Sequence, residues 1–446
     1  MPWRRPSDGI MATYSRTLSY AIRLSIALYM VMSFFLIQKV HVNSPHDIAT
    51  VLSQRKKEFI LGSGGKGIRD TNKMQQLTTT SRVLNELHRP VSQILSNPKL
   101  PDWVRKYAKW HAQQRKQYFD DMRANATSDV RFLISRCLSN DHCGGASDRL
   151  QDIPYNIMLA NQTNRVLLVR WEKPAKLENF LIPPEDGIDW TVPDDMFPKG
   201  ENWHLRGKED SEHKIVSTIR RDSAAPKFKN YEVTELGGDR IYHEIFRLLF
   251  SPSEVLTARI QSTMKSLQLN PKEYSSVHLR VKYPVKGIKE HDFSFQKHKS
   301  KITGWATNAV NCAAELHPNS TIYVSSDNND TVGYLLEESH FAQHYIDATK
   351  HKKHPLVVKL VARDYSTENE HVAFSQNTEV DGFMSVFEDL FIMGLGKCVA
   401  HGVGGYGRLG AALCGGECVM AHRKHRGDPN MCSDALKDIQ RNIDKR

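Results

Sequence analysis

Three short apolar runs in the C-terminal half of the chain most constrain its fold, because each ends abruptly in polar residues or glycine. They lie at residues 276–280, at 322–327 and within 388–410. A buried parallel strand is apolar almost throughout, and the carboxyl ends of such strands open into the ligand crevice of an α/β sheet. We therefore expect the functional residues at these three strand ends.

Strand and helix patterns alternate around these runs. Strands are predicted at 274–279, 321–325, 356–361 and 397–400, and helices at 304–316 and 331–343. Repeated β-α-β units with short turns predict a parallel, doubly wound sheet. An earlier α/β unit is predicted from about residue 130, with a helix at 151–161, a strand at 165–171, a charged insertion at 200–235 and a helical linker at 239–268. Two such lobes would enclose a cleft, where a ligand would bind.

The last run contains a glycine loop between two helices. One helix should end at Leu395, with Gly396 as its cap, and a second should begin near Arg408. Between them, residues 401–407 read His-Gly-Val-Gly-Gly-Tyr-Gly. Glycines let backbone N–H groups crowd around a ligand, and a helix N-terminus favours anions, so this junction suits a diphosphate. Arg408 could add a charge-assisted contact, and the alternative is a plain tight turn.

A second glycine turn lies at 143–150, which reads Cys-Gly-Gly-Ala-Ser-Asp-Arg-Leu. It precedes the helix predicted at 151–161, so Asp148 and Arg149 would lie at the start of that helix and face the cleft. Asp148 could equally be an N-cap, because Asp is among the residues preferred there. Both interpretations remain open from the sequence.

The N-terminus predicts a membrane anchor. Residues 24–37 are largely apolar and follow several arginines with a single acidic residue. We expect a cytosolic tail at 1–23 and a signal anchor at 24–42, since no convincing cleavage site follows. The alternatives are a cleaved signal peptide and a buried cytosolic helix. The anchor predicts a single-pass type II Golgi membrane protein that contacts the lipid bilayer through residues 24–42 and has a lumenal body.

Sequons and cysteines agree with a lumenal body. Four Asn-x-Ser/Thr sequons begin at Asn125, Asn161, Asn319 and Asn329. The seven cysteines allow up to three disulfides, with Cys137 and Cys143 as a plausible local pair. A zinc site formed by C-terminal cysteines and histidines is the alternative, although the chain has no Cys-x-x-Cys pair.

Neither the basic residues nor the glycine cluster near the N-terminus indicates nucleic-acid binding or a P-loop. The net charge is +11, but the basic residues are spread widely and no RNA- or DNA-binding motif accompanies them. The glycine cluster at 62–67 lacks the spacing of a P-loop. It falls in a stem and helical region at 43–129, in which 81–122 has helical periodicity. The basic cluster at 422–426 is predicted to be a solvated tail.

The order of four motifs resembles that of the GDP-fucose-dependent fucosyltransferase superfamily, which includes the α-1,6-, α-1,2- and protein O-fucosyltransferases. The motifs lie at 143–150, 278–280, 323–327 and 389–410, and the likeness spans roughly 137–414. The resemblance implies a GT-B-like α/β fold with two Rossmann-like lobes. The N-terminal, acceptor-side lobe would cover 130–250, and the C-terminal, nucleotide-sugar lobe 251–446. This chain departs from the family pattern after Arg280, where Val-Lys-Tyr replaces the usual Arg-x-Asp, and in its final loop, which lacks Ser or Thr at 402–405.

The resemblance also implies roles for individual residues. Arg280 would bind the donor pyrophosphate, and the glycine loop would cradle the phosphates. The implied substrate-binding residues are Gly144, Gly145, Arg149, Ser326, Asp327, Gly404, Gly405, Gly407 and Arg408.

The chemistry implied for the site is transfer of fucose from GDP-fucose to a glycan or glycoprotein. The departing GDP gains negative charge, which a fixed guanidinium can stabilise in place of a metal. No convincing Asp-x-Asp motif occurs, so we expect no metal and no cofactor beyond the donor substrate. Asp148, His278 or Glu388 could be the general base. The alternatives are a different nucleotide-sugar donor, or an inactive relative that binds glycans.

Overall fold

The computed structural model describes residues 80–192, 204–205, 212–219, 239–282, 294–337, 359–365, 379–416 and 418–423. The chain divides into two units, Met1–Asp70 and Thr71–Arg446, and every described residue belongs to the second. The signal anchor expected at 24–42 lies outside the described residues. Within the described residues, no helix has both the length and the apolar character that a membrane span requires.

The first sheet has four parallel strands in the order β2-β1-β5-β4. Its strands are β1 (Phe132–Cys137), β2 (Val166–Trp171), β4 (His204–Leu205) and β5 (Ile215–Thr218). The expected strand at 165–171 is confirmed as β2. Strand β5 lies inside the segment interpreted as a charged insertion, and its two apolar residues were too weak a signal to predict it.

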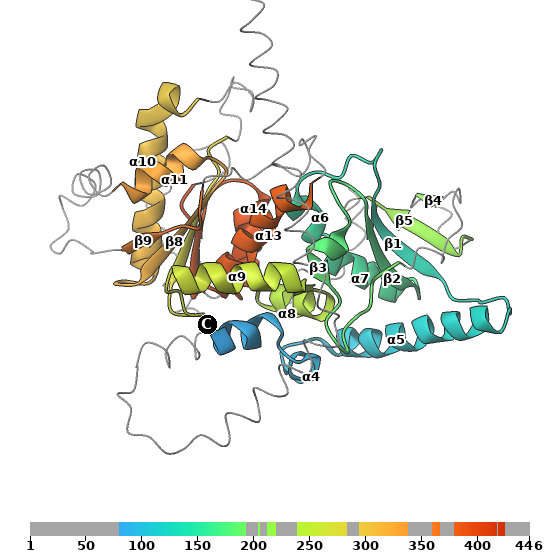
Figure 1. Ribbon diagram of the computed structural model, residues 1–446. Helices are drawn as coiled ribbons and strands as arrows, with labels where there is room; N and C mark the ends of the chain where they lie inside the picture. The colour runs from blue at the N-terminus through green and yellow to red at the C-terminus, as the bar shows by residue number, and fades with distance from the viewer. Residues whose placement is uncertain are drawn as a thin grey trace, which may run out of the picture. The chain divides into compact units, whose positions relative to one another are not determined.

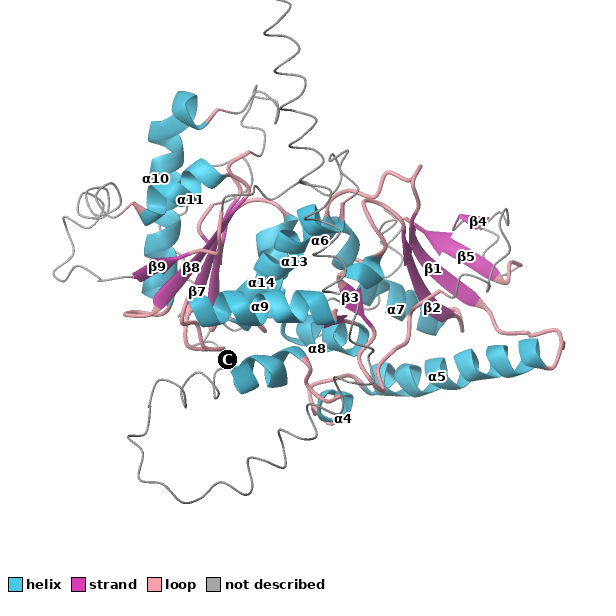
Figure 2. Cartoon of the chain, viewed as in Figure 1, coloured by secondary structure: helices cyan, strands magenta, loops and turns pink. Residues whose placement is uncertain are grey.

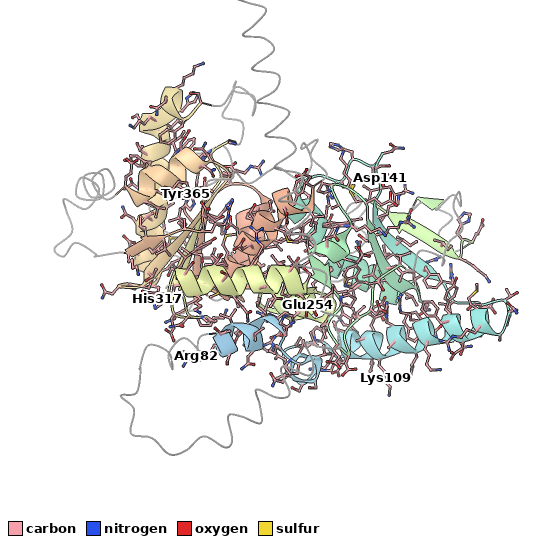
Figure 3. The ribbon with its side chains drawn as sticks, viewed as in Figure 1. Arg82, Lys109, Asp141, Glu254, His317 and Tyr365 are labelled. Carbon is pink, nitrogen blue, oxygen red and sulfur yellow. A yellow bond between two sulfur atoms is a disulfide. The ribbon has the colours of Figure 1, made fainter. Side chains whose placement is uncertain are left out.

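Helix α5 (Asp102–Arg123) packs against this sheet through an amphipathic face. Its buried side chains recur three or four residues apart, which is the spacing of one helix face. The hydroxyl of Tyr107 donates to the carbonyl of Arg165 and accepts from the N–H of Leu167, both at 3.0 Å. Lys109 lies on the exposed side of the helix (Figure 3). The helical region predicted within 43–129 therefore contributes to the core.

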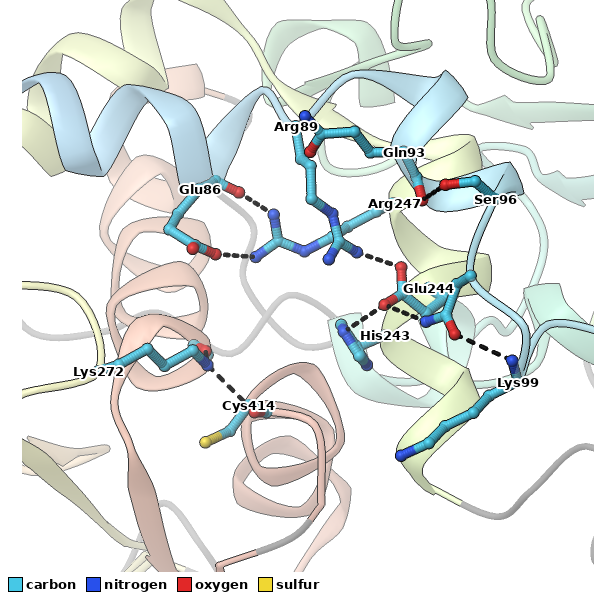
Figure 4. Close-up of polar contacts among 12 residues, drawn as sticks. Glu86, Arg89, Gln93, Ser96, Lys99, His243, Glu244, Arg247, Lys272 and Cys414 are labelled. Carbon is cyan, nitrogen blue, oxygen red and sulfur yellow. Dashed lines mark hydrogen bonds and ion pairs between the residues drawn. The ribbon is translucent and has the colours of Figure 1, made fainter.

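Helix α8 (Asp239–Leu249) contacts the segment 80–97, which includes helix α4 (Val91–Leu95), through ion pairs and hydrogen bonds. Arg89 pairs with Glu244, which is only 3% exposed, and Arg247 donates to the backbone carbonyl of Glu86 (Figure 4). Asn97 also donates to Glu244, at 3.0 Å. These contacts supply the buried carboxylate with partners, as burial of a charge requires.

The second sheet has five parallel strands in the order β11-β10-β7-β8-β9. Strands β7, β8 and β9 are labelled in Figure 2. Its strands are β7 (Ser275–Leu279), β8 (Thr321–Ser326), β9 (Lys359–Val361), β10 (Cys398–His401) and β11 (Val419–Ala421). The first four confirm predicted strands, and β11 was not predicted. An α/β protein with parallel sheets, as the sequence predicted, is thus observed.

Helices cover both faces of the second sheet (Figure 1). One face packs on α10 (Phe295–Leu316) and α11 (Asn329–Leu336), and the other on α13 (Val380–Leu395) and α14 (Gly405–Leu413). The helical linker predicted at 239–268 consists of two helices. They are α8 and α9 (Glu254–Ser266), separated by β6 (Ser251–Pro252), which pairs with β3 (Leu181–Ile182). The remaining elements are α6 (Ala146–Leu150), α7 (Ile153–Gln162) and the 3-10 helix η1 (Leu177–Asn179).

Two disulfides join described residues. The local pair Cys137–Cys143 is confirmed, and Cys398–Cys418 links β10 to the segment that begins β11. The second disulfide removes Cys418 from the ligands of the alternative zinc site. Among the described residues, no three metal-ligating side chains cluster, and Cys414 is not part of a disulfide.

Candidate functional site

The carboxyl ends of β7 and β8 place Arg280 beside Asp327. The two strands are paired, with Leu279 opposite Ser326, so the next residue of each strand lies at the same edge of the sheet. Arg280 Nε lies 4.0 Å from Asp327 Oδ2. Asp327 Oδ1 also accepts a hydrogen bond of 2.8 Å from the N–H of Val281. Burial raises the pKa of the Asp327 carboxyl, and the Val281 hydrogen bond opposes that rise. Asp327 therefore holds the backbone that follows Arg280.

The glycine loop after β10 lies against the Arg280 side chain. Gly404 is the N-cap residue of α14 and has a φ of 91°, a conformation that favours glycine. A Cβ atom added there would lie 3.1 Å from Arg280 Cδ and 3.9 Å from its Nε and Nη1. The guanidinium is thus next to the first turn of a helix, whose N–H groups and dipole favour an anion.

The N-terminal motif reaches the same loop from the other sheet. A Cβ on Gly405 would lie 2.8 Å from Ser147 Oγ, at the start of α6. Gln151 Nε2 donates a hydrogen bond of 2.7 Å to the carbonyl of Gly405. Gln151 and Gly405 are 254 residues apart in the chain, so the fold brings together two distant segments, and chain order alone does not show this contact.

Within the N-terminal motif, the two charged residues have different surroundings. Asp148 is exposed and is the third residue of α6, and its Oδ2 accepts a hydrogen bond of 2.8 Å from the N–H of the N-cap residue Gly145, as in a capping box. Arg149 is 4% exposed, and its guanidinium donates to the carbonyls of Gly144 and Lys173. Gly144 has a φ of 71°. The Arg149 contacts hold the loop in shape, while the Asp148 carboxylate lies at the surface.

His278 lies under the glycine loop. It is 4% exposed, and its carbonyl accepts hydrogen bonds from the N–H of Gly402 and from His422 Nε2. A Cβ on Gly407 would lie only 2.5 Å from His278 Nδ1, so the imidazole and the helix backbone are in direct contact. Burial, together with the positive charge of Arg280, lowers the pKa of His278 to about 3. An imidazole with so low a pKa is a poor general base near neutral pH.

Glu388 lies on α13 and is paired with α9. It is 2% exposed, accepts from the Thr263 hydroxyl at 2.5 Å and forms an ion pair of 3.2 Å with Arg259. These contacts connect α13 to α9, so the Glu388 carboxylate points toward α9.

The neighbouring Asp389 was not predicted as a site residue and is buried beneath β8. It accepts from the hydroxyls of Tyr323 and Ser325, at 2.5 and 3.1 Å, and from Arg363 Nε at 3.0 Å. These bonds tie α13 to the carboxyl ends of β8 and β9.

The other predicted ligand residues differ in exposure. Ser326 is 4% exposed, and its hydroxyl accepts a hydrogen bond of 3.2 Å from the N–H of Asn328. Arg408 is exposed on the first turns of α14. Of the three candidate bases, the structure leaves Asp148 as the exposed carboxylate beside the glycine loop.

The prediction of a solvated tail at 422–426 is wrong for its first two residues. His422 and Arg423 are 2% and 8% exposed, because β11 pairs with β10 and carries them into the protein. A Cβ on Gly402 would lie 2.9 Å from His422 Cε1. Only three residues form β11, which is too short a run to predict a strand.

Comparison with known proteins identifies similar structures only. No family model matches the chain, and no curated protein matches it. A mutant of Arabidopsis thaliana FUT1 in complex with GDP is similar over 75% of this chain and 81% of that one, with a TM-score of 0.48 and 12% identity. The fucosyltransferase NodZ from Bradyrhizobium is similar over 64% of this chain and 92% of that one, with a TM-score of 0.35 and 15% identity. The chain is thus structurally similar to fucosyltransferases at low sequence identity.

Proposed function

We propose that the protein is a GT-B type glycosyltransferase that transfers fucose from GDP-fucose to a glycan or glycoprotein acceptor. The observation that supports this most is the contact between Arg280 and Gly404 at the N-terminus of α14. A guanidinium and the free N–H groups of a helix start together form a site for a diphosphate. Each of these parts was expected at a strand end from the sequence.

The proposed reaction moves one sugar and one proton. The acceptor hydroxyl forms a bond to C1 of fucose, while the bond from C1 to the β-phosphate oxygen breaks and GDP leaves with the bonding electrons. Arg280 and the first N–H groups of α14 stabilise the charge that develops on the departing phosphate. The hydroxyl proton passes to a general base, and no metal is needed for this step.

Asp148 is the base that we propose. It is exposed, and the neighbouring Ser147 faces Gly405 across the site. Replacing Asp148 with Asn should lower kcat by about 100-fold or more while the KM for the donor changes little. Replacing Glu388 with Gln is the matched comparison: loss of the ion pair with Arg259 should lower stability, whereas kcat of the folded enzyme should change only a few-fold. The opposite pattern would make Glu388 the base.

We further propose a Golgi membrane location with a lumenal body. Supporting this, Asn125 and Asn319, which begin two of the sequons, are exposed in turns with φ of 53° and 59°. Both should carry N-glycans in secretory cells, so peptide N-glycosidase F should increase the gel mobility of the protein. Asn125→Gln and Asn319→Gln should each remove one step of that shift. A protein with no such shift would contradict the location.

The donor is tested by incubating the full-length protein with a panel of nucleotide sugars. Thermal stabilisation specific to GDP, together with slow hydrolysis of GDP-fucose, is the expected result. A response to a different nucleotide sugar would replace the donor but keep the reaction class. No response to any of them would favour an inactive glycan-binding relative.

A further inference from the structure

Arg423 is a buried arginine that the reaction above does not use. It follows β11, is 8% exposed, and lies over the indole of Trp305, with 3.5 Å between its Cζ and the ring centroid. Among the residues that the structure describes, its buried Nε has no hydrogen-bond partner. A buried donor without a partner is costly, and a functional site is one explanation for it.

The position of Arg423 is at the edge of the sheet that carries Arg280. Strand β11 pairs with β10, with Ala421 opposite His401, so the chain after β11 runs beside the glycine loop. His422, the preceding residue, faces Gly402 of that loop and donates to the carbonyl of His278. Asn308 of α10 donates to the carbonyl of His422 at 3.0 Å. The main chain on the N-terminal side of Arg423 is therefore fixed from two directions.

Charge at this edge is unbalanced. Burial lowers the pKa of Arg423, and the carboxylate of Asp327 opposes that change, so the two groups interact. Arg280 also lies beside Asp327. The Lys282 ammonium acts on Asp327 as well, so among the described groups three cations share one carboxylate, and charges held away from water need compensation. A bound anion would supply it.

We propose that Arg423 is a second phosphate-binding residue of the nucleotide site, and that it contacts the diphosphate of the bound nucleoside diphosphate. The inference rests on the proposed function. The Trp305 ring covers one side of the guanidinium, and the planar N–H donors of an arginine are the groups that bind phosphate oxygens. Trp305 thus acts as a positioning residue, because its ring fixes the plane of the Arg423 guanidinium.

Calorimetric titration of the full-length protein with GDP, GMP and guanosine tests this inference. Arg423→Gln should weaken GDP binding by about tenfold or more, because a charge-assisted hydrogen bond is lost, while guanosine binding stays unchanged. Trp305→Leu should weaken GDP binding in the same direction but by less. Lys301→Gln is the matched control, since this exposed ammonium also lies near the Trp305 ring, at 5.2 Å, and its loss should leave GDP affinity unchanged.

The outcomes separate this inference from the proposed function. If the wild-type protein binds GDP and Arg423→Gln binds it equally well, this inference fails and the proposed function stands. Equal losses for GDP and guanosine would place Arg423 at the nucleoside and overturn the phosphate contact. A wild-type protein that binds no GDP would overturn both. If Arg423→Gln does not fold, Arg423→Lys is the second variant, because it keeps the charge but lacks the planar set of N–H donors. Undiminished GDP binding by Arg423→Lys would refute recognition of the phosphate oxygens by those planar donors.

Discussion

Gly407 provides a sharp test of the packing around the candidate site. A Cβ there would lie 2.5 Å from His278 Nδ1, 2.9 Å from His278 Cγ and 3.0 Å from His401 Cβ. Gly304, in helix α10, is the matched control, because a Cβ at that position would meet nothing within 4 Å. Both glycines lie in helices and neither has a left-handed φ, so helix propensity alone predicts that alanine stabilises each position.

The two substitutions should change the free energy of unfolding in opposite directions. Gly304→Ala should raise the free energy of unfolding by about 1 kcal/mol, the usual gain from Gly to Ala in a helix. Gly407→Ala gains a similar amount but must displace a buried imidazole ring, and overpacking costs about 1–3 kcal/mol. With a contact as short as 2.5 Å, we expect the upper end and a net loss of about 2 kcal/mol. The two variants should therefore differ by about 3 kcal/mol.

Urea denaturation followed by tryptophan fluorescence measures both variants. Gly410→Ala adds an intermediate case, since its Cβ would lie 3.0 Å from Met393 Cε, which can move, and 3.1 Å from Met393 Cβ, which is fixed to the backbone, and both contacts are longer than the 2.5 Å contact at Gly407. The expected order of stability is Gly304→Ala, then Gly410→Ala, then Gly407→Ala. If Gly407→Ala is stabilised as much as Gly304→Ala, the ring does not lie against α14 and the reasoning about this site is wrong.

Two further predictions concern pH and the second disulfide. Burial lowers the pKa of His278 to about 3 and that of His422 to about 4, so below pH 6.5 the unfolded chain binds more protons than the folded one and stability falls. Between pH 7 and pH 5, each histidine should lower the free energy of unfolding by about 2 kcal/mol. The His422→Gln variant should lose about 2 kcal/mol less than the wild type over this range, as measured by urea titrations at the two pH values. Replacing both Cys398 and Cys418 with Ala should lower the free energy of unfolding by about 3 kcal/mol, because the disulfide closes a 20-residue separation, and should weaken GDP binding by releasing β11. An unchanged urea midpoint would contradict the disulfide prediction.

The sequence was most informative where apolar runs were long. Strands β7 and β8 have five and six residues, and each ends in polar groups, so their positions and the parallel sheet followed from pattern alone. The glycine spacing after β10 likewise placed a loop and a helix start, although α14 begins at Gly405, three residues before the expected position.

What the sequence could not show depends on contacts between distant segments. Strand β11 is three residues long, and its burial comes from pairing with β10 and from the Cys398–Cys418 disulfide, so a basic cluster that looked solvated is partly buried. Arg149 looked like a ligand residue because it follows a glycine turn, yet its guanidinium satisfies main-chain carbonyls of Gly144 and Lys173. The residue type predicted a positive charge at position 149 but not the groups that it binds.

The central claim is that Arg280 and the start of α14 bind a diphosphate, and titration of GDP into the wild-type protein and Arg280→Ala tests it most directly. Removing the guanidinium should weaken GDP binding by about tenfold or more while the melting temperature of the ligand-free protein changes little, because the side chain faces the loop and one carboxylate. A folded Arg280→Ala protein that binds GDP with wild-type affinity would contradict the account.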